Sequence, residues 1–281
     1  MGNMRRTKVV LFGILLCCVS IFFCTCFITA TAEHAPWDCP ECGKMGNTKN
    51  YCGGCAHPAP WKKEAFQMVG NIVQFGHYEQ DNNMENAKEP IEWTVLDYDA
   101  KNDRALLLSR YGLDAKPYNT KCVDITWEKC TLRKWLNGEF LNNAFSKAER
   151  RNILKTKVDN SKNQAYGGRE KNGGKNTQDK IFLLSCAEAD QYLGVTTGSA
   201  NMKARISPTA YALQAGAWTN YNGYKTEDGA VAGWWWLRSP GNDPYLAAYI
   251  SIDGTLSSYR VDIVIGCVRP ALWVNLKSDF N

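Results

Sequence analysis

The sequence predicts a domain of the α+β class, with an antiparallel strand meander near the C-terminus and short helices before it. Residues 91–99 and 247–253 alternate apolar and polar side chains, the pattern of strands with one buried face. Residues 132–140 place Leu, Trp, Leu and Phe at helical spacing. Asp253-Gly254 is a turn signal of the kind found in hairpins. Strands joined by tight turns and interrupted by isolated helices favour a mixed fold.

The composition is that of a globular protein and not of a nucleic-acid-binding one. Of the 281 residues, 44% are hydrophobic and 22% are charged, and the net charge is only +5. No Lys/Arg block is large enough for a nucleic-acid footprint, so we expect no nucleic-acid partner. The 10 tryptophans and 13 tyrosines are unusually many, and their large amphipathic rings suit both cores and binding surfaces.

Residues 1–32 are predicted to address the chain to a membrane. A short basic start precedes an uncharged apolar run over residues 9–30, which is long enough to span a bilayer. Because Glu33 is the first charge after this run, the positive-inside rule sends residues 33–281 out of the cytoplasm. Ala30-Thr31-Ala32 fits a signal-peptidase site, so a cleaved signal and a retained anchor both stay open. We expect a membrane-anchored or secreted protein with an extracytoplasmic domain.

Residues 33–61 are predicted to form a zinc-ribbon-like knuckle and a linker. Two C-x2-C pairs separated by nine residues offer four thiolates, which close a tetrahedral Zn²⁺ site. Such a site is structural, because four sulfur ligands leave no open position for catalysis. The alternative is a pair of disulfides, which an exported location favours. His57 is either a substitute ligand or a surface residue. The predicted zinc ligands are Cys39, Cys42, Cys52 and Cys55.

Residues 62–281 are predicted to form the main domain. Residues 71–80 and 91–99 alternate as strands, and the second of these runs through a short turn into residues 104–110, which predicts a hairpin. Residues 127–145 carry their apolar side chains at helical spacing, so a helix packs there.

Further helices are predicted from capping signals. The motif S-x-x-E occurs at residues 146–149 and 185–188, where each copy forms a capping box that opens a short helix. Residues 208–218 begin with proline in a first helical turn and reach Gly216 near their end, which brackets another short helix. Residues 160–178 are rich in glycine and polar side chains without an apolar period, so we expect a surface loop.

The C-terminal meander is predicted to have one apolar and one polar face. Residues 261–266 and 268–276 supply later strands that pair back antiparallel. A face of tyrosine and short polar residues is typical of binding surfaces, because tyrosine gives contact area at little entropic cost. An ordinary solvated strand face is the alternative. The candidate ligand-binding residues are Asn242, Asp243, Tyr245, Tyr249, Ser251, Asp253, Ser257, Tyr259 and Asp262.

Trp235, Trp236, Arg238 and Arg269 are predicted to be structural. Trp234 and Trp236 share one strand face and Trp235 takes the other, so some rings fill the core while others shape its rim. Both arginines lie within apolar strands, where charged side chains are rarely unpaired. We expect a buried salt bridge or a backbone clamp that locks the meander. The alternative is that each arginine anchors a ligand carboxylate.

Several motifs of the main domain follow one another in an order that resembles a known family. They are FGHYEQ (75–80), IEWTVLD (91–97), LLLSRYGLD (106–114), LRKWLNGEF (132–140), DKIFLLS (179–185), PTAYA (208–212), WWLRSPG (235–241) and CVRPALWV (267–274). Over residues 70–281 the sequence resembles an uncharacterised bacterial family of exported domains with a C-type-lectin-like fold. This family is similar to the variable proteins of diversity-generating retroelements, whose lectin-like domains end in a meander closed by a G-[VF]-R segment. Here Cys267 stands between Gly266 and Val-Arg-Pro, which shifts that closing pattern by one residue.

The resemblance implies a non-catalytic binding or display module on the bacterial cell surface. Its ligand would be an extracellular protein or a glycan, contacted by the polar face of residues 242–262, which would be the diversified region. Calcium-dependent sugar binding in lectins needs a Glu-Pro-Asn or Gln-Pro-Asp loop and a Trp-Asn-Asp strand. The sequence has neither, so no calcium site is implied.

An enzyme is the main alternative, and a structural envelope protein is the other. Sulfatase-modifying enzymes share the lectin-like fold and use cysteines, which would make Cys186 and Cys267 the candidates, although buried structural thiols also account for both. His77 is the single histidine of the main domain, and no Ser-His-Asp or Cys-His set accompanies it. We therefore predict no catalytic residues. The acidic residues that fit a helix surface or a loop better than a general acid pair are Glu188, Asp190 and Glu227.

Overall fold

The computed structural model describes residues 36–39, 42–49, 59–161, 165, 172–220 and 223–277, all within one compact unit of the chain, Pro36–Asn281. The membrane segment predicted at residues 1–32 lies outside the described residues. Among the helices that are described, none is long and apolar enough to cross a membrane. The main domain and the first part of the knuckle are thus the regions with a described structure.

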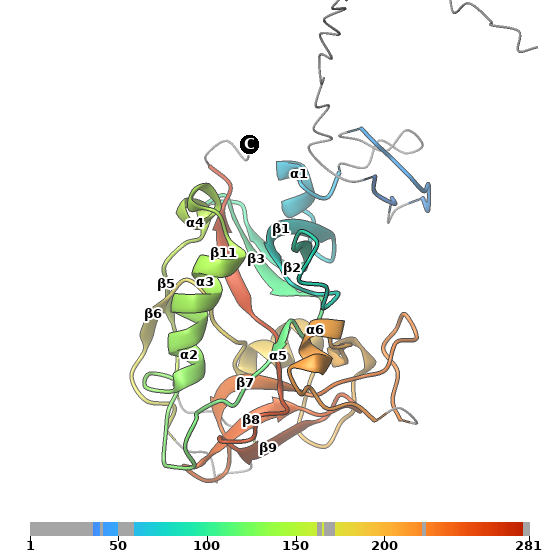
Figure 1. Cartoon of the computed structure of the whole chain (residues 1–281). Helices are drawn as coiled ribbons and strands as arrows, with labels where there is room; N and C mark the ends of the chain where they lie inside the picture. Colours follow the sequence, from blue (N-terminus) through green and yellow to red (C-terminus); the bar gives the residue numbers. More distant parts are fainter. Residues whose placement is uncertain are drawn as a thin grey trace, which may run out of the picture. The chain divides into compact units, whose positions relative to one another are not determined.

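A four-stranded antiparallel sheet forms one half of the main domain (Figure 1). Its strands, in spatial order, are β1 (Ile72–Tyr78), β2 (Glu89–Asp99), β3 (Arg104–Ser109) and β11 (Ala271–Asn275). Burial alternates along β2, as the apolar and polar alternation of its sequence predicted. The predicted hairpin is confirmed, because β2 pairs antiparallel with β3.

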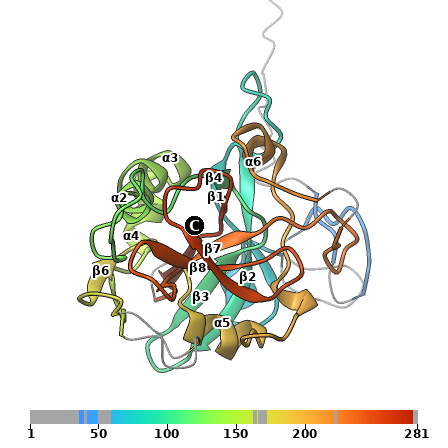
Figure 2. The same ribbon diagram turned by 90° about the horizontal axis from the view of Figure 1, so that it is seen from below.

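A five-stranded sheet forms the other half, and its meander lies across the lower end of the domain in Figure 1 and in front in Figure 2. Its strands, in spatial order, are β4 (Asp114–Ala115), β10 (Cys267–Val268), β7 (Trp235–Pro240), β8 (Leu246–Ile250) and β9 (Leu256–Arg260). The predicted antiparallel meander is confirmed in β7, β8 and β9. β10 breaks the pattern, because it pairs parallel with β7.

The prediction of a strand over residues 261–266 is wrong. These residues form turns between β9 and β10. Gly266 lies against the rings of Trp234 and Trp236, where a Cβ atom would come within 2.5 Å of both. The turns carry the chain past these rings so that β10 can run parallel to β7. Residues 268–276 do contain a strand, β11, which pairs antiparallel with β3 outside the meander.

Short helices flank the sheets, with α2 and α3 on one side and α6 on the other (Figures 1 and 2). The described helical segments are α1 (Lys63–Phe66), α2 (Thr131–Trp135), the π-helical turn η1 (Leu136–Phe140), α3 (Leu141–Ala144), α4 (Lys147–Asn152), α5 (Cys186–Leu193), the 3-10 turn η2 (Met202–Ala204) and α6 (Ala210–Gln214). α2, η1 and α3 follow one another without a break, which confirms the helix predicted within residues 127–145. Both predicted capping boxes are formed, at the starts of α4 and α5.

The start of α6 differs by one residue from the prediction. Thr209 is the N-cap, and its hydroxyl accepts a hydrogen bond from the Ala212 N–H at 3.1 Å. Pro208 therefore precedes the helix instead of lying in its first turn. Gly216 follows the helix with φ of +108°, as its predicted role at the helix end requires.

The loop predicted over residues 160–178 ends in a strand. β6 (Thr177–Asp179) pairs antiparallel with β5 (Thr156–Val158) to form a small separate sheet. Residues 162–164 and 166–171 lie outside the described residues, so the middle of the predicted loop is not tested.

One large hydrophobic cluster joins both sheets and the helices, so the described part of the main domain has a shared core. A separate small cluster of Trp37, Cys39 and Ala59 belongs to the knuckle. The predicted α+β class with mostly antiparallel sheets is confirmed. The bulkiest fully buried side chains of the main core are Trp93, Trp127, Trp235 and Trp236.

Gly76 is the glycine whose replacement tests the packing of β1 against the helices. It lies at an irregularity of β1 with φ of +73°, and a Cβ atom there would come within 2.5 Å of the Phe145 ring. We expect Gly76→Ala to lower the free energy of unfolding by about 2–4 kcal/mol, because left-handed backbone strain and overpacking add. Urea denaturation followed by fluorescence measures the change.

Gly138→Ala is the matched control. Gly138 lies within η1, and a Cβ atom there would have no neighbour within 4 Å. The free energy of unfolding should stay unchanged or rise by up to about 1 kcal/mol, because alanine favours a helix. Equal losses in both variants would contradict the packing argument.

Candidate functional site

β7 is the central strand of the candidate site, and all six of its residues are buried. The indole N–H of Trp235 donates to the Ala204 carbonyl at 2.9 Å, and that of Trp236 donates to the Lys116 carbonyl at 3.0 Å. Because neighbouring residues of a strand point to opposite faces, these two rings fix β7 from both sides. Both tryptophans thus make the contacts expected of structural residues.

An aromatic cluster covers one face of the meander. We define the Trp234 cluster as Trp234, Trp236, Tyr249 and Tyr259. The ring centroid of Trp234 lies 4.8 Å from that of Trp236, 4.9 Å from that of Tyr249 and 6.3 Å from that of Tyr259. Edge-to-face contacts of this kind stabilise aromatic pairs beyond the area that they bury. Two of the predicted ligand-binding tyrosines, Tyr249 and Tyr259, are therefore held in place by tryptophans.

The surface beside the Trp234 cluster exposes several large side chains. Tyr259 is 46% exposed and Tyr245 is 41% exposed, although Trp234 itself is only 5% exposed. Trp218 and Val264, at 46% and 57% exposure, lie on segments that adjoin the cluster. The Trp218 N–H bonds to the Ile265 carbonyl, and Gly266 in the same segment contacts the Trp234 ring.

Trp218 and Val264 are not among the ligand-binding residues predicted from the sequence. Trp218 follows the end of α6 and Val264 lies in the segment wrongly predicted as a strand, so neither belonged to the expected polar face. The sequence signal for each was an apolar side chain in a turn, just after a helix or a strand. Such a signal does not show which other part of the surface the turn lies beside.

Three of the predicted ligand-binding residues use their side chains within the fold. Asn242 accepts a hydrogen bond from Ser258 at 3.0 Å. Asp253 accepts from the Thr255 hydroxyl at 2.7 Å and stabilises the β8–β9 turn. Asp262 forms an ion pair with Arg260 at 2.8 Å. Three further predicted residues are half-buried, namely Asp243, Ser251 and Ser257.

Arg238 makes a buried ion pair on β7. The side chain is only 3% exposed, and its guanidinium pairs with both carboxylate oxygens of Glu188, which opens α5. It also donates to the carbonyls of Leu183 and Asp159, at 2.8 and 2.9 Å. Since Glu188 lies 50 residues earlier in the chain, this pair ties α5 to β7. Arg238 therefore has the buried salt bridge that was the expected structural role.

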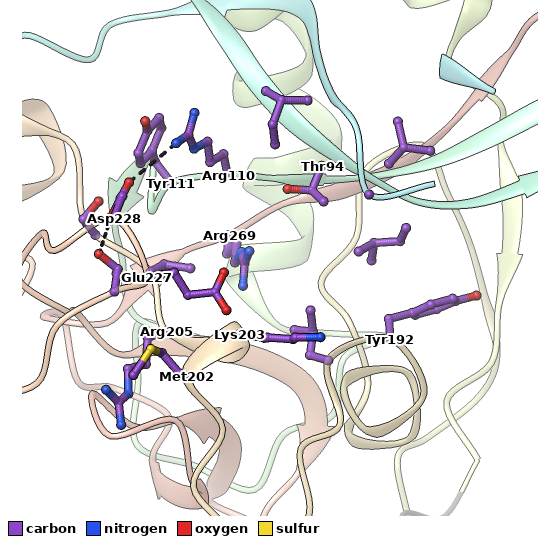
Figure 3. Close-up of a pocket in the computed structure, with 18 of the residues that line it drawn as sticks. Thr94, Arg110, Tyr111, Tyr192, Met202, Lys203, Arg205, Glu227, Asp228 and Arg269 are labelled. Atoms are coloured by element: carbon purple, nitrogen blue, oxygen red, sulfur yellow. Dashed lines mark hydrogen bonds and ion pairs between the residues drawn. The ribbon is translucent and has the colours of Figure 1, made fainter. Parts of the chain in front are cut away.

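Arg269 has a different environment, beside a cavity of about 500 Å³ (Figure 3). Its Nε donates to the Ser109 carbonyl at 2.9 Å, and the guanidinium lies over the Trp235 ring at 4.8 Å. Its Nη1 is buried without a hydrogen-bond partner. Burial lowers the pKa of Arg269 to about 9, so the group still carries its charge at neutral pH. The backbone clamp expected for Arg269 is present, whereas an acidic partner is absent from the described residues.

Other cations line the same cavity but are engaged. Arg110 pairs with Glu92 at 2.9 Å and with Asp228 at 3.5 Å. Arg205 donates to the carbonyls of Asp253 and Lys225, at 3.1 and 3.0 Å. The charge of Arg110 and the N–H groups of Arg205 are therefore engaged within the cavity wall. Arg269 is the buried cation of this wall that has no ion pair with a described residue.

An acidic triad lies elsewhere on the surface. Carboxylate oxygens of Glu79, Asp81 and Glu89 come within 4.8 Å of one another. Each carboxylate already accepts a hydrogen bond from a backbone N–H. The Asn83 N–H donates to Glu79 and to Asp81, and the Gln80 N–H donates to Glu89. Burial and the charge of Glu89 raise the pKa of Glu79. The triad is satisfied as a turn structure.

The knuckle is described only in its first half. Cys39 is buried and Cys42 is exposed. Gly43, directly after Cys42, has a left-handed backbone with φ of +69°, which turns the chain. The Gly43 N–H bonds to the Cys39 carbonyl at 3.0 Å. Cys52, Cys55 and His57 lie outside the described residues, so the four-cysteine zinc site stays a prediction.

Comparison with known proteins assigns the chain to a family. The model of the family described as Domain of unknown function (DUF6273) matches residues 102–276, which is more than half of the 281 residues. No curated protein and no solved structure matches the chain. The matched range contains the whole five-stranded sheet, the Trp234 cluster and Arg269. The chain belongs to the family Domain of unknown function (DUF6273).

Proposed function

We propose that the protein is a non-catalytic binding module that contacts an extracellular protein or a glycan through the surface around the Trp234 cluster. The observation behind this proposal is the exposure of Tyr259, Tyr245, Trp218 and Val264 beside a buried Trp234 ring. Exposed apolar side chains that gather on one part of a surface mark interaction sites more often than single exposed side chains do.

Rigid packing of the aromatic rings favours binding at this surface. Tyr259 packs on Trp234, whose ring is in turn fixed by Trp236 and Tyr249. A ligand that stacks on a fixed ring does not have to order it, so less binding energy is lost in immobilising side chains. The half-buried serines Ser251 and Ser257 supply hydrogen-bonding groups on the same sheet. Aromatic contact area beside short polar groups suits both sugar rings and peptide surfaces.

We propose a C-type-lectin-like fold for the main domain. The pairing of β11 with β3 and the closure of the meander by residues 266–269 support it, because the proteins that the sequence resembles end in such a meander. The diversified positions would lie among the exposed residues and not at Asn242, Asp253 or Asp262, whose side chains have partners within the fold. Placement at the bacterial cell surface rests on the apolar run of residues 9–30.

Substitution of exposed aromatic residues tests the binding surface. In a screen of the full chain in detergent micelles against arrayed glycans and bacterial surface proteins, Tyr259→Ala and Trp218→Ala should each weaken binding about tenfold or more, as hot-spot aromatic residues do. Both side chains are nearly half exposed, so the variants should keep the fold.

Tyr224→Ala is the matched control, because Tyr224 is 47% exposed and packs on Arg205 instead of the Trp234 cluster. It should bind as the unchanged protein does. Equal loss in all three variants, or no binding by the unchanged protein, would contradict the proposed surface.

We also propose a structural Zn²⁺ held by Cys39, Cys42, Cys52 and Cys55. The tight turn at Gly43 supports it, because zinc knuckles place two thiolates on such a turn. Metal analysis of the purified protein should find about one Zn²⁺ per chain. After denaturation with chelator and without reductant, all four thiols should react with iodoacetamide. Failure of these thiols to react before reduction would establish disulfides instead.

The enzyme alternative required a reactive cysteine, and Cys267 does not fit that role. Its side chain is fully buried, and burial raises the pKa of the thiol to about 12. A thiol with such a pKa stays protonated at neutral pH, and the thiolate is the nucleophile. Cys186 is also buried, in the first turn of α5.

Native-state alkylation tests this assignment. At pH 8, iodoacetamide should modify Cys122, which is exposed, and leave Cys267 unmodified until the protein is denatured. Peptide mass spectrometry reads both sites in one sample, so Cys122 serves as the internal control. Modification of Cys267 at the rate of Cys122 in the folded protein would restore the enzyme hypothesis.

A further inference from the structure

The cavity beside Arg269 is lined by a buried positive charge that forms no ion pair with a described residue. Arg269 is 5% exposed, and its one hydrogen bond to the described residues is that of Nε to the Ser109 carbonyl. Nη1 is buried and has no partner. Arg238, which is 3% exposed in the same domain, pairs with Glu188. Of the two arginines that are buried in the described part of the chain, one therefore has a carboxylate partner and the other does not.

An unpaired buried guanidinium is costly. Taking the charge out of water is compensated only by an opposite charge and by hydrogen bonds that use the remaining N–H groups. The Trp235 ring offers partial compensation through its negative face, 4.8 Å from the guanidinium. Nothing among the described side chains bonds to Nη1. Arg269 lines the cavity, so an anion that enters it would supply the missing opposite charge.

The cavity has the size and the walls of a small-molecule site. Its volume is about 500 Å³, which lies within the usual range of ligand pockets. Accessible aliphatic side chains form one part of its wall, where Val69 and Ile72 line it before and at the start of β1, and Leu96 and Leu193 line it from β2 and α5. Ile206 lines it from the segment after η2 and is almost fully buried. An inorganic ion would leave these apolar walls without contact, whereas an organic acid would cover them.

The charges at the edge of the cavity limit the charge of the ligand. Lys203 and Glu227 are exposed residues that line it, and in Figure 3 the Glu227 carboxylate points into the cavity on the side of Arg269. A second negative charge on the ligand would be repelled by Glu227. The ion pair of Arg110 with Glu92 and Asp228 leaves Arg110 without a free charge for such a group.

We propose that this cavity binds a small organic monocarboxylate, with the carboxylate on the Arg269 guanidinium and an aliphatic part against Val69, Ile72, Leu96 and Leu193. The site is independent of the surface around the Trp234 cluster. Arg269 stacks on Trp235, and Trp235 and Trp236 point to opposite faces of β7, so the two sites lie on opposite sides of one strand.

Isothermal titration calorimetry of the full chain in detergent micelles tests the proposal with four probes. Hexanoate should bind. Hexanamide has the same chain without the charge, adipate carries a second carboxylate, and inorganic phosphate lacks an aliphatic part, so each should bind at least about tenfold more weakly. Absence of hexanoate binding at about 10 mM, or equal binding of hexanamide or phosphate, overturns the proposal.

Variants of the cavity locate the binding. Arg269→Gln should lower hexanoate affinity about tenfold or more, because it removes the charge and keeps a donor. Circular dichroism shows whether this variant folds. If it does not, Glu227→Lys decides, since Glu227 is exposed: hexanoate affinity should rise about threefold or more and adipate should approach hexanoate.

Glu85→Lys is the matched control for charge, because this substitution changes the net charge by the same amount. Glu85 is exposed and does not line the cavity. It should leave hexanoate affinity unchanged. An equal rise in Glu85→Lys and Glu227→Lys, or no rise in Glu227→Lys, overturns the placement of the ligand in this cavity. Unchanged hexanoate binding by folded Arg269→Gln does so as well.

Discussion

The closing segment of the chain, residues 267–275, is the constraint on which the two sheets depend. β10 pairs within the five-stranded sheet, beside β7, and β11 pairs three residues later within the four-stranded sheet, beside β3. Arg269 lies between them, bonded to the Ser109 carbonyl at the end of β3 and stacked on Trp235 of β7. A single side chain thus contacts both sheets, and burial of its charge follows from that position.

The two buried arginines show how differently a fold satisfies the same group. Arg238 acquires a carboxylate, because the capping box that opens α5 places Glu188 against β7. The guanidinium is then part of a buried pair whose charges compensate each other. Arg269 bonds to a carbonyl, stacks on an aromatic ring and lines a cavity, and it forms no ion pair with a described carboxylate. Both residues are arginines and both are buried, so the residues around each guanidinium decide whether it has a carboxylate partner.

The alternation of β7 separates two kinds of surface. Trp235 lies under Arg269 and beside Ala204, whereas Trp236 packs with Trp234 and Tyr249 on the other face. Because consecutive side chains of a strand point in opposite directions, one short run of tryptophans supports an aromatic surface and a cavity wall at once. The unusual number of tryptophans in residues 234–236 is explained by this double role.

The sequence by itself determined the features that depend on neighbours in the chain. Period-2 alternation predicted β1 and β2, and the short turn after β2 predicted β3 as its hairpin partner. The S-x-x-E motifs predicted the starts of α4 and α5, and Asp253-Gly254 predicted the β8–β9 turn. Only the tertiary structure decided that residues 261–266 turn past Trp234, that β10 runs parallel to β7, and that Arg238 and not Arg269 meets a carboxylate. These outcomes depend on contacts between residues far apart in sequence, and local periodicity carries no information about which distant segment a side chain will meet.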